Sequence, residues 1–197
     1  KEALPAFEKW LAEASALIRS LDQNHLISVG SEGSWGCEND LGSWTRICAD
    51  QNIDYCNVHL WPYNWGWAAP ERLVEDLPKA CENTKEYIGQ HLAVCDSLGK
   101  PLVMEEFGYP RDGFKFTIDT PTNGRDGYYN FAGCNFWGWG GLAQPKHEQW
   151  QVGDDYTNDP AQEAQGLNSV FASDTTTLAV IREQVQRMKS ATTESNK

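Results

Sequence analysis

A chain of 197 residues, 40% apolar and 22% charged, can bury a core and is ordinary in composition for one globular domain. The net charge of −12 repels phosphate backbones, and no apolar run reaches the ~20 residues of a membrane span, so we expect no nucleic-acid partner and no membrane association. Nine tryptophans, seven tyrosines and seven phenylalanines form the main departure from average usage.

The first predicted element is an amphipathic helix, because apolar residues recur at i, i+3 and i+4 over residues 4–21. Residues 26–30 (LISVG) form a short apolar run ending in glycine, which is typical of a buried parallel strand. A polar loop over 31–39 and a short helix over about 40–49 follow.

The rest of the chain alternates strands and helices. The predicted strands are about 54–60, 101–107 and 134–137, and the predicted helices are 77–98, capped by Gly99, and 175–188. Alternation of this kind predicts a parallel sheet with helices outside it. The stretch 108–133 has room only for a helical stub at 125–131, and the tail 190–197 is predicted to be disordered.

Three predicted strands end in residues suited to chemistry, namely Asn57-Val58-His59-Leu60-Trp61, Glu105-Glu106-Phe107-Gly108 and Asn135-Phe136-Trp137-Gly138-Trp139. Active groups of parallel α/β folds lie at such ends. Strand alternation predicts that His59 and Glu106 face one barrel mouth and that Glu105 points toward the helix layer. Indole rings stack on sugars, although each of these features alone is also typical of core packing.

The six cysteines are not spaced as a metal site, and the four histidines do not complete one. We therefore expect no metal and no cofactor, and we interpret most cysteines as small buried thiols, with one or two disulfides left open. The acidic run 154–159 lacks the glycine and terminal glutamate of a calcium loop, which favours a solvated loop.

Five stretches together resemble glycoside hydrolase family 5, and within it the endo-β-1,4-mannanases of bacterial type. They are LISVGSEGSWG, IDYCNVHLWPYNWGW, KPLVMEEFGYPRDGF, AGCNFWGWGG and GDDYTNDPAQEAQGLNSVF. The resemblance implies an α/β fold of the (β/α)8 TIM-barrel family, with strands 5–8 and their helices in residues 1–189. It also implies a retaining mechanism on β-mannan or glucomannan in preference to cellulose.

The resemblance further implies a role for each matched residue. Glu106 is expected to be the nucleophile, and His59 to hydrogen-bond near it. Trp137 is expected under the sugar at the cleavage point, Trp61 and Trp65 beside the cleft, Trp139 near them, and Glu32 as a polar wall residue.

The family's acid/base glutamate follows an asparagine, and this chain contains no Asn-Glu pair. We therefore expect the chain alone to be nearly inactive and to self-associate through exposed barrel edges. The complete protein is expected to be secreted or periplasmic, although Lys1 to Leu4 has no signal-peptide core. The alternatives are a non-catalytic or degenerate carbohydrate-binding half-barrel, and a family 5 enzyme acting on another β-1,4-glycan such as cellulose.

Overall fold

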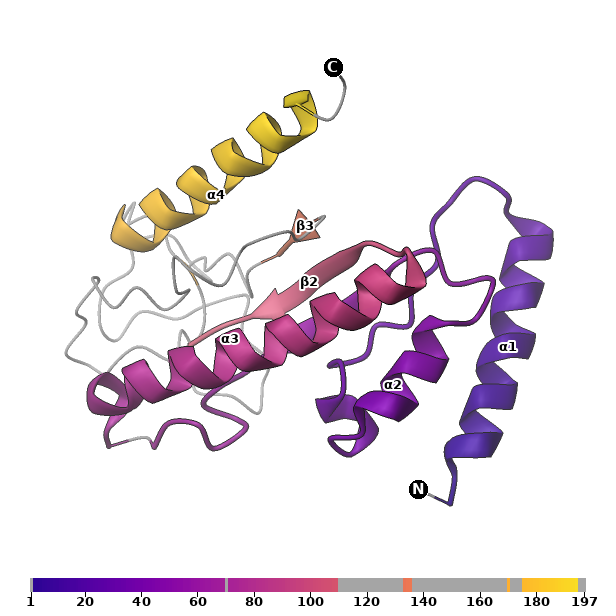
Figure 1. Ribbon diagram of the computed structural model, residues 1–197, viewed down its shortest axis with the longest axis horizontal. Coiled ribbons are helices and arrows are strands. Elements are labelled where there is room, and N and C mark those ends of the chain that lie inside the picture. The colour runs from indigo at the N-terminus through magenta and orange to yellow at the C-terminus, as the bar shows by residue number, and fades with distance from the viewer. Residues whose placement is uncertain (1, 70, 110–132, 136–169, 171–174, 195–197) are drawn as a thin grey trace, which may run out of the picture. The chain divides into compact units, whose positions relative to one another are not determined.

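The computed structural model describes residues 2–69, 71–109, 133–135, 170 and 175–194 (Figure 1). The chain divides into two compact units. The first unit contains residues 1–60, 86–106 and 130–135, and the second contains 61–85, 107–129 and 136–197. The candidate catalytic residues Glu106 and His59 both belong to the first unit.

Two helices of the first unit pack on each other, α1 (Leu4–Leu21) and α2 (Leu41–Cys48) (Figure 1). Both predicted helices are confirmed. Asp40 caps α2, because its Oδ1 accepts a hydrogen bond from the Ser43 amide at 3.1 Å. A short 3-10 helix, η1 (Trp35–Cys37), lies between them in sequence. The core beneath these elements consists of Leu11, Ile27, Ile47 and Ile53, with Val29 and Cys37 packed against it.

The sheet of the first unit has the order β1-β2-β3, with β1 (Cys56–Leu60), β2 (Leu102–Phe107) and β3 (Gly133–Cys134). Strands β2 and β3 are parallel, which confirms the predicted direction for this pair. Every residue of β1 is buried, as expected for a strand that is covered on both faces. The sheet brings the ends of β1 and β2 together, and both ends carry the candidate catalytic residues.

The apolar run 26–30 is not a strand, so this prediction is wrong. Backbone amides that would form hydrogen bonds to a neighbouring strand instead donate to side chains of the segment around β1. The amide of Ile27 donates to Asp54 Oδ2 at 2.7 Å, and the amide of Gly30 donates to Asn57 Oδ1 at 3.2 Å. One backbone–backbone bond joins this run to another described segment: the Ile27 carbonyl accepts from the Asp54 amide at 2.9 Å. The hydrogen bond from the Ile27 amide and, to a smaller extent, the one from the Arg19 guanidinium hold the pKa of the Asp54 carboxyl below its usual range.

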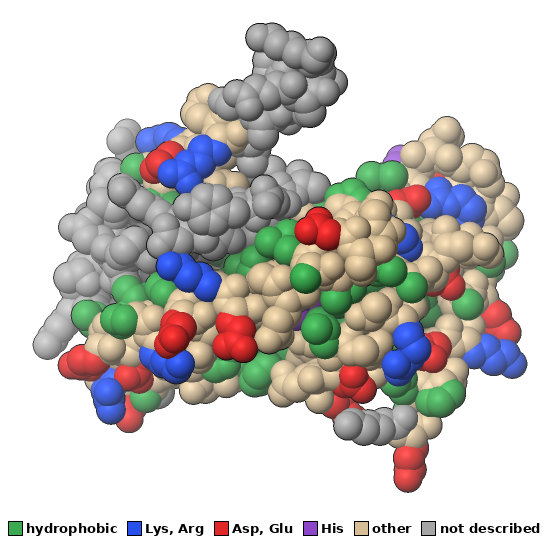
Figure 2. Space-filling view, in the orientation of Figure 1, with side chains coloured by type: hydrophobic (Ala, Val, Ile, Leu, Met, Phe, Trp, Pro, Cys, Tyr) green, Lys and Arg blue, Asp and Glu red, His purple; other side chains and the backbone are tan. Residues whose placement is uncertain are grey.

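Helix α3 (Leu73–Leu98) begins earlier than the predicted residue 77 and contains Pro78. The predicted glycine at its end is confirmed, since Gly99 has a φ of +65°. On the face drawn in Figure 2, acidic and basic side chains are interspersed along α3, and Lys79 pairs with Glu82 at 2.8 Å. This charged face is typical of an amphipathic helix whose other side is apolar.

Helix α4 (Thr175–Glu194) in the second unit runs past the predicted end at 188 and includes part of the predicted tail 190–197. The second unit also has an apolar cluster around Ala68, Leu73, Ala80 and Tyr109. Tyr109 Oη donates to the Leu73 carbonyl at 2.6 Å, and burial raises the pKa of Tyr109 to about 12. The helical stub at 125–131 and the predicted strand residues 136–137 lie outside the described residues.

Five cysteines of the described part of the chain are free thiols, of which Cys48, Cys56 and Cys95 are buried. This confirms the interpretation of these three as small buried groups. Contact with Cys56, together with burial, raises the pKa of Cys48 and Cys95. Among the described residues, no helix has both the length and the apolarity needed to cross a bilayer.

Candidate active site

Three alternate residues of the segment that enters and forms β1, Tyr55, Asn57 and His59, carry polar side chains that bind other parts of the first unit. Asn57 is 1% exposed and ties down the preceding loop, because its Nδ2 donates to the Ser31 carbonyl at 2.6 Å. Tyr55 donates to Glu105, and His59, which is 8% exposed, lies next to Glu105 and Glu106. Strand alternation therefore gathers one polar face at the end of the sheet.

The imidazole of His59 lies between two carboxylates. Its Nδ1 is 3.3 Å from Glu106 Oε2, and its Nε2 is 3.7 Å from Glu105 Oε2. The Glu106 side chain is 35% exposed and that of Glu105 is 21% exposed. A residue that attacks a substrate needs an accessible oxygen, so Glu106 is the better placed of the two. The predicted neighbourhood of His59 and Glu106 is present in the structure.

The orientation predicted for Glu105 is wrong. Its carboxylate contacts Ser28, Tyr55 and His59, and these partners come from the loop before β1 and from the polar face of β1 rather than from a helix. Alternation fixes the direction of each Cβ, but a glutamate carboxylate lies three bonds further along a flexible side chain. The two nitrogens of one imidazole can therefore meet two consecutive glutamates.

Glu32 belongs to a loop that a buried histidine of α3 holds in place. The amide of Ser34 donates to His91 Nε2 at 2.9 Å, and His91 Nδ1 lies 2.6 Å from the Tyr87 carbonyl. Tyr87 Oη in turn donates to the Glu32 carbonyl. Burial lowers the pKa of His91 to about 4, so the ring is neutral at neutral pH. Since Nε2 accepts, Nδ1 carries the proton and donates to Tyr87.

The role of His91 was not predicted from the sequence. The available signal was the i, i+4 spacing of Tyr87 and His91, which puts both side chains on one helix face. Trp44 of α2 packs edge-on against His91, with ring centroids 4.4 Å apart. Burial is the main cause that raises the pKa of Tyr87 to about 12. The hydroxyl therefore keeps the proton that it donates to the Glu32 carbonyl.

The predicted sugar-binding tryptophans are only partly described. Trp61 and Trp65 are each 8% exposed, and the Trp65 amide donates to the Trp61 carbonyl at 2.9 Å. Trp65 packs edge-on against Trp67, with centroids 5.0 Å apart. Trp137 and Trp139 lie outside the described residues. The platform role of these rings stays a prediction.

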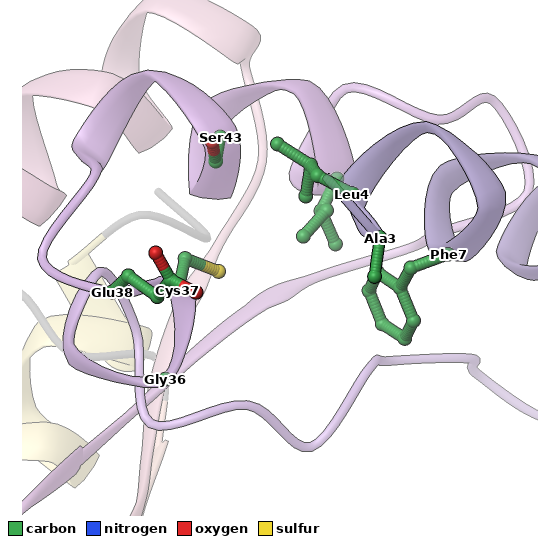
Figure 3. A pocket seen from close by; sticks show the side chains of 8 residues that line it. Ala3, Leu4, Phe7, Gly36, Cys37, Glu38 and Ser43 are labelled. Carbon is green, nitrogen blue, oxygen red and sulfur yellow. The ribbon is translucent and has the colours of Figure 1, made fainter. Parts of the chain in front are cut away.

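A cavity of about 220 Å³ lies where α1, η1 and α2 meet (Figure 3). It is lined by Ala3, Leu4, Phe7, Gly36, Cys37, Glu38, Ser43 and Ile47. Neither His59 nor Glu106 belongs to this lining. The lining is mostly apolar, so the cavity offers few hydrogen bonds to a carbohydrate, and the carboxylate pair remains the candidate site.

Comparison with known proteins gives consistent matches. A family model described as glycoside hydrolase family 5 β-mannosidase-like matches residues 1–193. The chain is 32% identical over 140 residues to mannan endo-1,4-β-mannosidase F of Aspergillus clavatus, a match that covers 62% of this chain and 30% of that enzyme.

Solved structures agree with the family match. A family 5 mannosidase from Rhizomucor miehei superposes with a TM-score of 0.78 at 28% identity, covering 96% of this chain and 50% of that one. A structure of a family 5 mannosidase from the same organism in complex with mannosyl-fructose gives a TM-score of 0.72 at 28% identity, covering 92% and 48%. The chain thus spans about half the length of these structures.

Proposed function

Because the chain belongs to glycoside hydrolase family 5, in the β-mannosidase-like group, we propose that it supplies the nucleophile side of a retaining endo-β-1,4-mannosidase that hydrolyses mannan or glucomannan. Its fold is the (β/α)8 barrel of that family, seen in part. We propose that residues 1–189 span barrel positions 5–8, with β1, β2 and β3 at positions 6–8 and the irregular segment 26–30 at position 5. The bacterial grouping stays a prediction, and the relatives compared above are fungal.

The observation that supports this function best is the placement of Glu106, with His59 Nδ1 at 3.3 Å from its carboxylate. In the retaining reaction, a Glu106 oxygen attacks the anomeric carbon while a second carboxylic acid protonates the departing glycosidic oxygen. The bond between sugar and leaving group breaks as the glycosyl-enzyme bond forms. Water then attacks the anomeric carbon while the second carboxylate takes a proton from it, and the bond to Glu106 breaks, so the sugar leaves with its configuration retained.

The second carboxylate is not Glu105. Retaining enzymes hold their two carboxyl groups ~5–5.5 Å apart on either side of the scissile bond. Glu105 instead shares one imidazole with Glu106 and accepts hydrogen bonds from Ser28 and Tyr55. We propose that the acid/base group is a glutamate supplied from outside this chain. We also propose that the complete protein acts outside the cytoplasm, where it encounters polymeric mannan.

The test of this function is substrate preference. A longer protein that carries this chain together with an acid/base glutamate should hydrolyse manno-oligosaccharides with kcat/KM roughly 10- to 100-fold above that for matched cello-oligosaccharides. Mannose differs from glucose in an axial 2-hydroxyl, and a polar group left unpaired by the wrong epimer costs about 1–3 kcal/mol. Equal values or a cellulose preference would contradict the mannan assignment. Binding without hydrolysis would favour the carbohydrate-binding alternative.

The 197 residues on their own should have almost no mannanase activity. General acid help at a glycosidic oxygen is worth roughly 10²–10⁴-fold, and the chain lacks the Asn-Glu pair of the family. We also propose that the isolated chain self-associates, because open sheet edges pair with other chains. Mannan assays and sedimentation on the isolated chain, beside the longer protein, check both points. A monomer with the turnover of the longer protein would contradict them.

A further inference from the structure

Two hydroxyl groups from separate segments hold one side of the Glu105 carboxylate. Ser28 Oγ and Tyr55 Oη each donate to Glu105 Oε1, both at 3.1 Å. Ser28 lies in the apolar run 26–30, and Tyr55 directly precedes β1. A carboxylate oxygen that already accepts two hydrogen bonds is poorly prepared to attack a sugar. Its position, by contrast, is well defined.

The other oxygen of Glu105 faces His59. His59 presents Nε2 to Glu105 at 3.7 Å and Nδ1 to Glu106 at 3.3 Å, and its side chain is only 11% exposed. A half turn of the ring would exchange both nitrogens for carbon atoms, so both carboxylates would lose their polar neighbour. Glu105 therefore favours the ring orientation in which Nδ1 faces Glu106. Ser28 and Tyr55 stabilise this arrangement indirectly.

We infer that Glu105 is a positioning residue of the reaction, one that acts through His59 to hold the imidazole with Nδ1 facing the nucleophile Glu106. The inference rests on the function proposed above. The hydroxyls of Ser28 and Tyr55 anchor Glu105, Glu105 orients His59, and His59 places the Glu106 carboxylate. Glu105 itself stays away from the substrate.

Two substitutions at Glu105, made in the longer protein, separate positioning from other roles. Glu105→Gln keeps an oxygen that accepts from Ser28 and Tyr55 and gains an N–H that can donate to His59 Nε2. Glu105→Ala removes both contacts. The alanine variant should lower kcat roughly 10- to 100-fold with little change in KM, since a small misplacement of catalytic groups costs about that much. The glutamine variant should keep most of kcat.

Each other result has a clear meaning. If both variants match the parent in kcat per folded molecule, Glu105 is merely structural and the inference is wrong. If Glu105→Gln abolishes turnover as fully as Glu105→Ala, the Glu105 carboxylate itself takes part in the chemistry, which also overturns the inference.

A double-mutant cycle tests the anchor. Tyr55→Phe should lower kcat several-fold in the parent, by roughly what one lost hydrogen bond is worth. It should have no further effect when Glu105 is already alanine, because residues of one network are not additive. Ser28→Ala is the matched variant on the other hydroxyl. Additive losses in kcat would show that Tyr55 and Glu105 act separately, which contradicts the inference.

A spectroscopic measurement makes the inference independent of turnover. With isotope-labelled histidine in the 197-residue chain, nuclear Overhauser contacts of the His59 ring C–H protons should report one ring orientation in the parent and in Glu105→Gln, and a mixture of both orientations in Glu105→Ala. If this pattern appears in a protein that lacks mannanase activity, only the proposed function fails. If turnover is present and the His59 ring signal is the same in the parent and in Glu105→Ala, only the inference fails.

Discussion

Replacing Glu106 with glutamine should lower turnover on mannan by roughly 10⁴-fold or more in the longer protein, while the fold and KM change little. Loss of a nucleophile has effects of this order, because no other group can form the covalent intermediate. Glutamine keeps the size of Glu106 and leaves an oxygen near His59 Nδ1, which lies at 3.3 Å from the present carboxylate. Steady-state kinetics with folded protein quantified by circular dichroism would measure the loss.

Two controls make the result specific. Glu82→Gln removes an exposed carboxylate from α3 and should leave kcat unchanged. Glu106→Ala should regain turnover with added azide, which enters the space left by the carboxylate and attacks from the same face, giving an α-mannosyl azide. Normal hydrolysis by Glu106→Gln would refute the assignment, as would labelling of Glu105 by a 2-fluoro-mannoside.

Replacing Gly33 with alanine should destabilise the first unit by roughly 2–5 kcal/mol. Gly33 has a φ of +73°, and an added Cβ would lie 2.4 Å from Tyr87 Oη and 2.8 Å from His91 Nε2. The left-handed backbone costs about 1–2 kcal/mol for alanine, and overpacking adds about 1–3 kcal/mol. The methyl group would also push apart the contacts that hold the loop carrying Glu32. Urea denaturation measures the change.

Gly30→Ala is the matched control for this substitution. Gly30 has a nearly identical φ of +71°, but nothing lies within 4 Å of the Cβ position. It should lose only the backbone contribution of about 1–2 kcal/mol. If Gly33→Ala and Gly30→Ala lose the same amount, the close packing around Gly33 contributes nothing and the account of this loop is wrong.

The pH dependence of the free energy of unfolding should show whether Gly33→Ala destabilises the protein by disturbing His91. The folded-state pKa of His91 is about 4, against an ordinary 6.5, so the unfolded chain binds more protons between these values. The stability contributed by neutral His91 is present above pH 6.5 and is lost as the pH falls toward 4, by roughly 3 kcal/mol in all. Gly33→Ala should flatten this slope because it disturbs the His91 site. Substitution of the exposed His25 should not.

The positions of the helices and of the candidate catalytic residues follow from the amino-acid sequence, although α3 and α4 extend beyond their predicted bounds. The apolar period over 4–21 predicted α1 with the bounds observed, and the polar ends of two strands predicted that His59 and Glu106 lie together. These features are local, because one face of a helix or strand is encoded in the spacing of neighbouring residues. The five family-like stretches predicted the family that the comparisons support.

The partner of each polar group, by contrast, depends on the three-dimensional fold. The fold turned Glu105 toward His59 and replaced the predicted strand at 26–30 by hydrogen bonds to the side chains of Asp54 and Asn57. It also joined His91 to Ser34, far away in sequence. The spacing of residues along the chain predicts the direction of a side chain but not its interaction partner. The partner comes from a segment distant in sequence, whose position depends on how the whole core packs.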